Sequence, residues 1–376
     1  MNAAPYFFLA FACVYITFQI VLFFRLSFYY KPVSFHSDSY KPLVSILIAA
    51  RDEEKNILRC LHTIHALQYS KDKIEIWIGD DQSTDNTFHL VADFIKDKPT
   101  YHLVSIQDKI GKAKGKANVL AQLARKASGE FLFITDADIE VPPYWIEGLL
   151  AGFDKPTIGI VSGSTVVKGS TLSARIQRTD WAYAFGMVHV VSEMNMPVTA
   201  VGNNMAIRKS CYESTGGYEN LSFSVTEDLE LFKVSLKKGW GYRNLLNPAS
   251  VAFSAPVETF KGLLHQRKRW TSGAFRLPVL LIIFLTMQAI YFPVLILSAF
   301  FVPWIWLLAF WLTIYNIQSG FIDLVARKLG LNSLRNNFLL FELNRYYFPV
   351  VLLLYRLLPI GVEWKGRIYK GKDIQP

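Results

Sequence analysis

Two carboxylates one residue apart, Asp136 and Asp138, follow the apolar run Phe131–Ile134. The run predicts a buried strand, and because alternate strand residues share a face, both aspartates can project to the same side. Two like charges this close repel each other unless a cation neutralises them, and Mg²⁺ or Mn²⁺ held together with substrate phosphates would do so. The same pair also fits a surface turn with exposed aspartates, so the surrounding elements have to decide.

The residues before this pair predict further strands that end in acidic groups. Val44–Ala50 is a continuous apolar run, typical of a strand covered on both faces of a parallel sheet, and Ile74–Gly79 predicts a second strand. Strands that alternate with helices form right-handed units with a nucleotide-sized crevice at the carboxyl ends of the strands. Asp80, Asp81 and Asp136 all fall at such ends, which favours a site over a turn.

Two helices are expected between these strands. Residues from Ile57 to Ile64 recur at helical spacing, and a second helix is expected at Phe88–Ile95. Ser83 and Thr84 stand before the second helix and are suited to cap it.

A basic loop, Lys109–Asn118, lies between the next expected strand, Tyr101–Ile106, and the pair at 136 and 138. Its position between strands with acidic ends favours contact of its lysines, Lys116 among them, with a diphosphate or a base. The alternatives are a solvated basic loop or a nucleic-acid patch. It is not a phosphate-binding P-loop, because the required glycine, lysine and serine or threonine spacing is missing.

The composition indicates a membrane protein with a soluble middle. Hydrophobic residues make up 52% of the chain and are concentrated at its two ends. The net charge of +10 fits basic residues that face anionic headgroups on the cytoplasmic side, and no nucleic-acid partner is expected, because these residues are dispersed. The three cysteines have no disulfide or zinc spacing, which fits a reducing compartment.

The first apolar segment, residues 1–30, is expected to be an uncleaved transmembrane anchor. No charged residue lies between Asn2 and Phe24, and this length is enough to cross a bilayer as a helix. A cleaved signal peptide is the alternative, but a basic start is missing and the apolar stretch is too long. Basic residues follow the segment, so we expect the amino terminus outside and the next domain in the cytoplasm.

Two more transmembrane helices are expected in residues 277–322, which carry no charge, with breaks near Pro293 and Pro303. The last apolar region, 338–360, contains three charged residues. We favour an interfacial or re-entrant helix there, because a third C-terminal span would place the basic tail, 361–376, outside the cytoplasm. A simple span stays the alternative, since charges near its ends can reach the interface.

Four separated motifs occur in this order: Asp80-Asp81, Asp136-Ala-Asp138, Thr226-Glu-Asp228 and Gln266-Arg-Lys-Arg269-Trp270. Together they resemble the membrane-bound family 2 glycosyltransferases, metal-dependent sugar-nucleotide enzymes with the GT-A fold, over about Val44–Gly273. The resemblance implies an α/β fold class with a Rossmann-like, mainly parallel catalytic domain at 41–262. An interfacial segment at 263–276 and α-helical transmembrane segments would complete the chain.

The resemblance also implies roles for these residues on the donor side. Asp80 or Asp81 would contact uracil, Asp136 would lie near the ribose and Asp138 would bind the metal. Asp228 would be the catalytic base of an inverting transfer, and Thr226 is expected to cap the helix that carries it. Further donor contacts would come from Lys116, Gln266, Arg269 and Trp270.

On the acceptor side, the resemblance points to Asn203, Asn204, Glu227 and Trp270. Arg267 and Lys268, inside the last motif, are instead expected to be juxtamembrane anchors that face lipid headgroups.

These inferences predict an inverting glycosyltransferase of the hexosyltransferase type that uses Mg²⁺ or Mn²⁺ and lies in a bacterial inner membrane. It would move a sugar from a nucleotide-sugar, UDP-linked by resemblance, to a membrane lipid or lipid-linked acceptor. A processive polysaccharide synthase is the nearer alternative, although three or four spans leave little protein for a polymer pore. A catalytically inactive membrane scaffold is the alternative from another class.

Overall fold

The computed structural model describes residues 4–33, 41–271, 277–358, 360–364 and 367–369. The chain forms two compact units, each continuous in space but not in sequence. The first contains Met1–Lys31, Gly169–Val198 and Pro256–Ile360, and the second contains Pro32–Lys168, Thr199–Ala255 and Gly361–Pro376. The basic tail, 361–376, falls largely outside the described residues.

The second unit is built on a seven-stranded sheet. Its strands β1, β2, β3 and β4 are parallel, and β8 runs antiparallel to both of its neighbours, β4 and β6. The strand order is β3-β2-β1-β4-β8-β6-β9, so the order reverses direction between β1 and β4. The bounds are β1 (Val44–Ala50), β2 (Ile74–Asp80), β3 (Tyr101–Ser105), β4 (Phe131–Asp136), β6 (Ile158–Ser162), β8 (Asn204–Arg208) and β9 (Gly241–Asn244). The mainly parallel sheet predicted from the apolar runs is confirmed.

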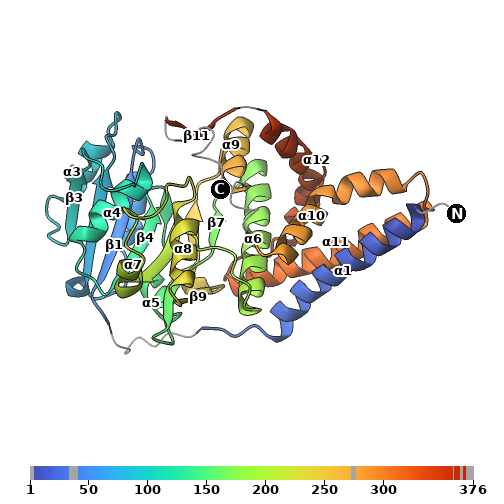
Figure 1. Ribbon diagram of the computed structural model, residues 1–376, viewed down its shortest axis with the longest axis horizontal. Helices are drawn as coiled ribbons and strands as arrows, with labels where there is room; N and C mark the ends of the chain where they lie inside the picture. The colour runs from blue at the N-terminus through green and yellow to red at the C-terminus, as the bar shows by residue number, and fades with distance from the viewer. Residues whose placement is uncertain (1–3, 34–40, 272–276, 359, 365–366, 370–376) are drawn as a thin grey trace. The chain divides into compact units, whose positions relative to one another are not determined.

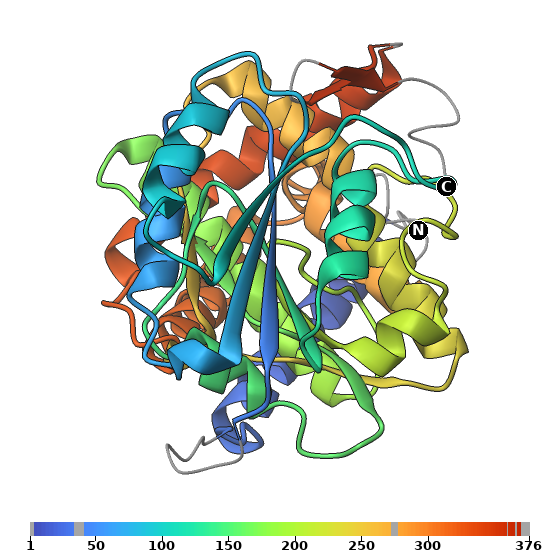
Figure 2. The same ribbon diagram turned by 90° about the vertical axis from the view of Figure 1, so that its left-hand side faces the viewer.

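Helices cover both faces of this sheet: in Figure 2 the strands run up and down the picture, with helices on either side. One face carries α2 (Ile57–His65), α3 (Thr87–Ile95) and α5 (Trp145–Leu150), and the other carries α4 (Lys116–Lys126), α7 (Lys209–Ser214) and α8 (Glu227–Lys237). The central strand shows why its sequence is continuously apolar: Ile46 and Ile48 enter the first core, whereas Leu47 enters the second.

Short elements surround the main sheet. The strand predicted from the run Phe131–Ile134 ends at Asp136, and a turn separates it from β5 (Ile139–Glu140). A three-stranded sheet in the order β5-β10-β7 joins this piece to distant parts of the chain. The remaining bounds in this unit are η1 (Lys71–Lys73), β7 (Thr165–Val167), η2 (Pro248–Ser250), β10 (Ala252–Ser254), β11 (Val362–Trp364) and β12 (Arg367–Tyr369).

The first unit is helical. Its helices are α1 (Ala4–Phe28), α6 (Leu172–Glu193), α9 (Phe260–Thr271), α10 (Val279–Ser298), α11 (Trp304–Lys328), η4 (Arg335–Asn337) and α12 (Phe338–Leu357). By length and composition, four of the described helical stretches could cross a membrane: Ala4–Phe28, Val279–Ser298, Trp304–Lys328 and Arg335–Leu357. Pro303 precedes α11 as expected, but Pro293 lies inside α10 and does not end it.

This division corrects the expectation of a continuous catalytic domain at 41–262. Helix α6 belongs to the helical unit because its apolar residues pack there: Tyr183 contacts Phe321 of α11 and Phe341 of α12. The chain therefore leaves the sheet unit after Lys168 and returns to it at Thr199.

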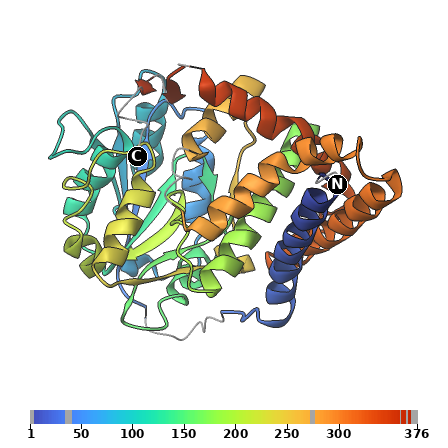
Figure 3. The same ribbon diagram turned by 45° about the vertical axis from the view of Figure 1, so that its right-hand side comes forward.

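Three of the apolar helices pack side by side (Figures 1 and 3). Helix α1 runs parallel to α11, since Phe8 contacts Phe310 near their beginnings and Tyr15 receives a hydrogen bond from Gln318 further along. Helix α10 runs antiparallel to α1, because Phe18 contacts Phe284 whereas Tyr15 contacts Tyr291. The start of α10 and the end of α11 therefore lie on the same side of the unit.

Candidate active site

The acidic ends of β2 and β4 lie at the same level of the sheet. The register pairs Ala50 of β1 with Asp80 and Ala49 with Asp136. Two strand spacings separate the two aspartates, about 10 Å between their backbones. Both stand beside the reversal of strand order, where open α/β sheets bind their ligands. The sequence expectation that these carboxylates share one edge is therefore met.

Asp80 is buried and only partly bonded. Its Oδ2 accepts a hydrogen bond from the Ser83 amide at 3.2 Å, whereas its buried Oδ1 has no hydrogen-bond partner among the described residues. Asp81 is also buried and lies 3.9 Å from the guanidinium of Arg51. A buried acceptor without a partner is unfavourable, so the Asp80 oxygen is suited to a donor group of a ligand.

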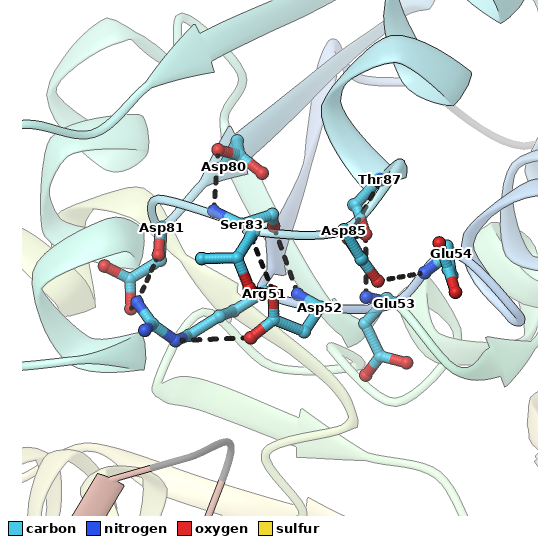
Figure 4. Close-up of polar contacts among 10 residues, drawn as sticks. Arg51, Asp52, Glu53, Glu54, Asp80, Asp81, Ser83, Asp85 and Thr87 are labelled. Carbon is cyan, nitrogen blue, oxygen red and sulfur yellow. Dashed lines mark hydrogen bonds and ion pairs between the residues drawn. The ribbon is translucent and has the colours of Figure 1, made fainter.

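Two loops hold this acidic edge together, as Figure 4 shows. Arg51 donates a hydrogen bond of 2.6 Å to the Asp81 carbonyl. The Asp52 amide donates to Ser83 Oγ at 3.1 Å, and the Thr84 amide donates back to Asp52 Oδ1 at 2.8 Å. Asp52 has a φ of 52°, a conformation that side chains rarely adopt without such support.

These contacts correct the expected cap of α3. The helix begins at Thr87 after Asn86, which makes no side-chain cap, and neither Ser83 nor Thr84 caps it. Their side chains bond to the Asp52 loop instead, because the close approach of two loops offers them partners that sequence alone does not reveal.

A buried lysine joins the carboxylates of β4 and α8. Lys116, the first residue of α4, places its Nζ 2.5 Å from Asp136 Oδ1 and 3.3 Å from Glu227 Oε1. Burial alone lowers the pKa of Lys116, but attraction to these two carboxylates outweighs burial and raises it. Lys116 is therefore charged at neutral pH and balances two acidic groups.

The carboxylates of α8 differ in environment. Burial raises the pKa of Glu227, the Lys116 cation opposes this effect and the neighbouring Asp228 adds to it. Asp228 accepts two main-chain hydrogen bonds, from Gly202 at 2.8 Å on Oδ2 and from Leu229 at 2.9 Å on Oδ1. The expected side-chain cap by Thr226 is absent, so the Gly202 loop rather than a cap holds Asp228.

The two asparagines after Gly202 take up different positions. Asn203 is half-buried, and its Oδ1 accepts a hydrogen bond from Thr165 at 2.9 Å. Asn204 is completely buried, and its amide bonds to Trp145 and to the carbonyls of Ser164 and Ser250. The oxygen and the nitrogen of this amide both bond inside the core, so Asn204 holds core elements together and does not contact the acceptor as expected.

The carboxylates of Asp136 and Asp138 are suitable ligands for a hard divalent cation. Ala137 between them is buried, whereas both aspartates, at the end of β4 and in the turn after it, are half-exposed. Among the described residues, no three His, Cys, Asp or Glu side chains converge on one point. This set fits Mg²⁺ or Mn²⁺ held by one or two carboxylates and completed by substrate phosphates, and it does not fit a site built from protein ligands alone.

The last motif lies on α9 in the helical unit. Gln266 has a buried Oε1 without a hydrogen-bond partner among the described residues, and Trp270 packs edge-on against Trp181 at 5.2 Å. The neighbouring basic residues are not lipid anchors. Arg267 is ion-paired with Asp180, and Lys268 is buried. The donor contacts of Arg269 and Trp270, and the acceptor contact of Trp270, stay predictions.

Lys268 binds the end of another helix. Its Nζ donates to the carbonyls of Tyr355, Leu358 and Ile360 at 3.3, 3.2 and 2.8 Å. The carbonyls at a helix carboxyl end have no partners within the helix, so a buried cation is well placed there. The juxtamembrane role expected for Lys268 is therefore wrong: a tertiary contact takes up its charge.

Two residues of this site carried no signal in the sequence. Gly202 was visible only as part of a Gly-Asn-Asn loop, and Arg51 only as part of a polar segment before a helix. Their partners, Asp228 and Asp81, are brought to them by the fold. A pairing between distant residues leaves no periodic pattern in a single sequence.

Comparison with known proteins gives the site its context. A β-monoglucosyldiacylglycerol synthase from Nostoc sp. is 28% identical over 250 residues, which cover 62% of this chain and 49% of that protein. A poly-β-1,6-N-acetyl-D-glucosamine synthase from Staphylococcus aureus is 29% identical over 260 residues, covering 68% of this chain and 60% of that protein. The chain thus spans only about half of the first of these curated relatives and three-fifths of the second.

A solved structure shares the fold. A mannosyltransferase from Pyrobaculum calidifontis in complex with GDP-Man and Mn²⁺ has a TM-score of 0.59 and 19% identity, covering 92% of this chain and 99% of that chain. The expected GT-A fold is thereby confirmed. The model of glycosyl transferase family 21 matches residues 4–373, nearly the whole sequence, and the chain belongs to this family.

Proposed function

We propose that this protein transfers one sugar from a UDP-linked donor to a hydroxyl of a membrane lipid or lipid-linked acceptor, with inversion at the anomeric carbon. The observation that carries the proposal is the convergence of Asp136, Lys116 and Glu227, with Asp228 next to it, at the carboxyl edge of the parallel sheet. Membership of a glycosyltransferase family and the position of this edge at the reversal of strand order support it.

The sheet unit offers groups for each part of the donor. Asp80 and Asp81 would meet the base, and Asp136 the ribose, since these carboxylates follow neighbouring strands. Asp138 would hold Mg²⁺ or Mn²⁺ jointly with the diphosphate; a bound divalent ion stabilises the negative charge that develops on the leaving group. Lys116 supplies a second cation beside Asp136. The Mn²⁺ and the nucleotide-sugar of the similar mannosyltransferase complex agree with such a site.

Asp228 would act on the acceptor side as the general base. Each of its oxygens accepts one main-chain hydrogen bond, and a carboxylate oxygen has a second lone pair for the proton of the acceptor hydroxyl. A positioned base contributes roughly 10²- to 10⁴-fold in rate. Glu227 already pairs with Lys116, so it is the less available of the two. Attack opposite the leaving diphosphate inverts the sugar, and one carboxylate is enough for it.

The proposed acceptor is a membrane lipid or a lipid-linked molecule. One relative is named for a glycolipid product and the other for a polysaccharide. We favour a lipid because export of a polymer needs a protein-lined pore, and four candidate spans offer little material for one. Donor contact by Gln266, Arg269 and Trp270, and acceptor contact by Asn203, Glu227 and Trp270, belong to the same proposal.

The helical unit suggests an orientation in the membrane. Arg25 lies in the last turn of α1 and Lys31 follows the helix, whereas Arg327 and Lys328 end α11. The basic residues therefore mark one side, which we propose faces the cytoplasm of a bacterial inner membrane. We further propose that α12 is an interfacial or re-entrant helix whose two ends lie on this side.

Both ends of α12 support this. The chain before α12 folds onto the end of α11, where Leu331 donates to the Ala326 carbonyl. The other end reaches α9, where the Tyr355 hydroxyl lies 3.0 Å from His265 Nε2. Helix α9 precedes α10, whose start lies on the same side as the end of α11.

The test is transfer by the full-length protein purified in detergent. UDP- and GDP-sugars would be supplied with lipid extract and either Mn²⁺ or Mg²⁺, and released nucleotide would be counted against modified lipid. We expect one nucleotide per glycosylated lipid from a UDP-sugar, and a loss of roughly 10²-fold or more in Asp228→Asn. Asp93→Asn, an exposed aspartate on α3, is the matched control and should keep native activity.

Other outcomes would separate the alternatives. Many transfers onto one growing chain would identify a polysaccharide synthase. Absence of transfer and of nucleotide binding by folded protein would support the inactive scaffold. Full activity of Asp228→Asn would overturn its role as base.

A further inference from the structure

We infer that Gly202 is a positioning residue that holds the Asp228 carboxylate and connects it to the Lys116–Asp136 ion pair. The inference rests on the proposed function, in which Asp228 is the base. It assigns a role to a residue that touches neither the donor nor the acceptor in that proposal.

The backbone of Gly202 bonds in two directions. Its N–H donates to Asp228 Oδ2 at 2.8 Å, and its carbonyl accepts from Lys116 Nζ at 3.3 Å. The same lysine lies 2.5 Å from Asp136. One residue therefore joins the proposed base to the carboxylate on the donor side.

Only glycine fits at this position for a steric reason. A Cβ at residue 202 would lie 2.7 Å from both Cβ and Oδ2 of Asp228, well inside van der Waals contact. The φ angle of Gly202 is not in the left-handed region, so the backbone conformation itself would accept another residue. The requirement for glycine thus comes from the closeness of Asp228.

The neighbours of Gly202 are anchored to the sheet. The Val201 amide donates to Ser162 Oγ at 3.0 Å, and the Asn203 carbonyl accepts from Thr135 at 3.1 Å. Because the loop is held on both sides, it cannot retreat from an added methyl group. Asp228 and the first turn of α8 must move instead.

The consequence is a change in transfer but not in donor binding. A misplacement of about 1 Å at a reacting group lowers a rate by roughly 10²-fold. We expect Gly202→Ala to lower kcat by about that factor, while UDP affinity with Mn²⁺, measured by calorimetry, changes less than about 3-fold. The control is Gly241→Ala on β9, where the nearest atom to an added Cβ is the flexible tip of Ile158 at 2.9 Å.

A double-mutant cycle separates positioning from general damage. If Gly202 acts through Asp228, adding Gly202→Ala to Asp228→Asn should lower the residual rate by less than about 3-fold, because residues that act as a unit are not additive. A further loss of about 10²-fold in that background would overturn the inference. If Asp228→Asn is inactive and the losses of the two substitutions add, the inference about Gly202 fails but the proposed function stands. If Asp228→Asn is fully active, Asp228 is not the base and the proposed function fails with it.

Thermal unfolding tests the inference even if Gly202→Ala folds poorly. If Gly202→Ala unfolds at a lower temperature because its methyl group meets Asp228, the double variant with Asp228→Gly should recover most of the lost thermal stability. No recovery would show that residue 202 needs glycine for another reason, and would also overturn the inference.

Discussion

The ammonium of Lys116 and the carboxylate of Asp136 form an ion pair of 2.5 Å at the carboxyl edge of the sheet, although the two residues lie 20 positions apart in the sequence. The pair connects the basic loop to the end of β4, and Glu227 at 3.3 Å extends it to α8. Three elements of the proposed site therefore depend on one cation.

Removal of that cation should destabilise the protein. Lys116→Met leaves Asp136 and Glu227 without their counter-charge, and because Asp136 is partly exposed we expect a cost of about 1 to 2 kcal/mol, between that of a surface pair and a buried pair. We expect a lower unfolding temperature in detergent and a loss of transfer. Lys114→Met is the control, because Lys114 is exposed and lies over the Phe223 ring at 4.8 Å. Equal stability of the two variants would show that Lys116 is not a structural cation.

Metal removal should abolish transfer. The proposed site has too few protein ligands to hold a divalent ion without substrate, so EDTA should stop the reaction and Mn²⁺ or Mg²⁺ should restore it. Asp138→Asn should raise the metal concentration needed for half-maximal rate by about 10-fold or more. Metal titration of the initial rate measures both effects. Undiminished transfer in EDTA would contradict the proposed metal dependence.

The stability of the protein should depend on pH through Glu75, which lies near the start of β2, at the end of the sheet opposite the proposed site. Glu75 accepts hydrogen bonds from Ser45 at 2.5 Å, from the Ser128 amide at 2.6 Å and from the Gly129 amide at 3.3 Å. Burial raises the pKa of Glu75, but these hydrogen bonds outweigh burial and lower it below 4.5. They fasten the residues before β4 and thereby its register.

A group with a lowered folded pKa stabilises the protein above its unfolded pKa, and this contribution disappears as pH falls through the folded pKa. We expect Glu75→Gln to lower stability by about 2 kcal/mol at pH 7 and by much less below pH 4. Thermal unfolding across this pH range measures the difference, with exposed Glu213→Gln as the control. A deficit that is constant with pH would contradict this assignment.

The contact of Lys268 with the end of α12 should be worth a measurable part of the stability of the helical unit. Lys268→Met removes a cation from three carbonyls, and we expect a loss of about 2 kcal/mol in detergent. Lys261→Met on the same helix is the control, because Lys261 is exposed. If the two variants unfold at the same temperature, water hydrogen-bonds the three carbonyls as well as Lys268 does, and the prediction is wrong.

The side of the membrane on which the chain ends should decide the position of α12. With α1, α10 and α11 as spans and α12 interfacial or re-entrant, a tag at the amino terminus should be accessible from outside. A tag at the carboxyl terminus should become accessible only after the membrane is permeabilised. Antibody or protease access in spheroplasts measures this. A carboxyl-terminal tag accessible in intact spheroplasts would show that α12 crosses the membrane.

Elements whose signal is local could be predicted from the amino-acid sequence alone. The apolar runs at β1, β2 and β4 matched the strands almost residue by residue, because a strand covered on both faces must be apolar throughout. The long uncharged stretches likewise marked α1, α10 and α11. The acidic ends of β2 and β4 could be placed on one edge because parallel strands bring their carboxyl ends together.

The partners of the polar residues depend on the tertiary structure and could not be predicted from the sequence. Nothing in the chain around Gly202 indicates Asp228, and the expected caps at Ser83, Thr84 and Thr226 were wrong because other groups lay closer in space. Lys268 was assigned to lipid and instead binds the end of α12. The physical reason is the same in each case: a polar side chain bonds to whatever the fold brings within about 3 Å, and that neighbour is often distant in sequence.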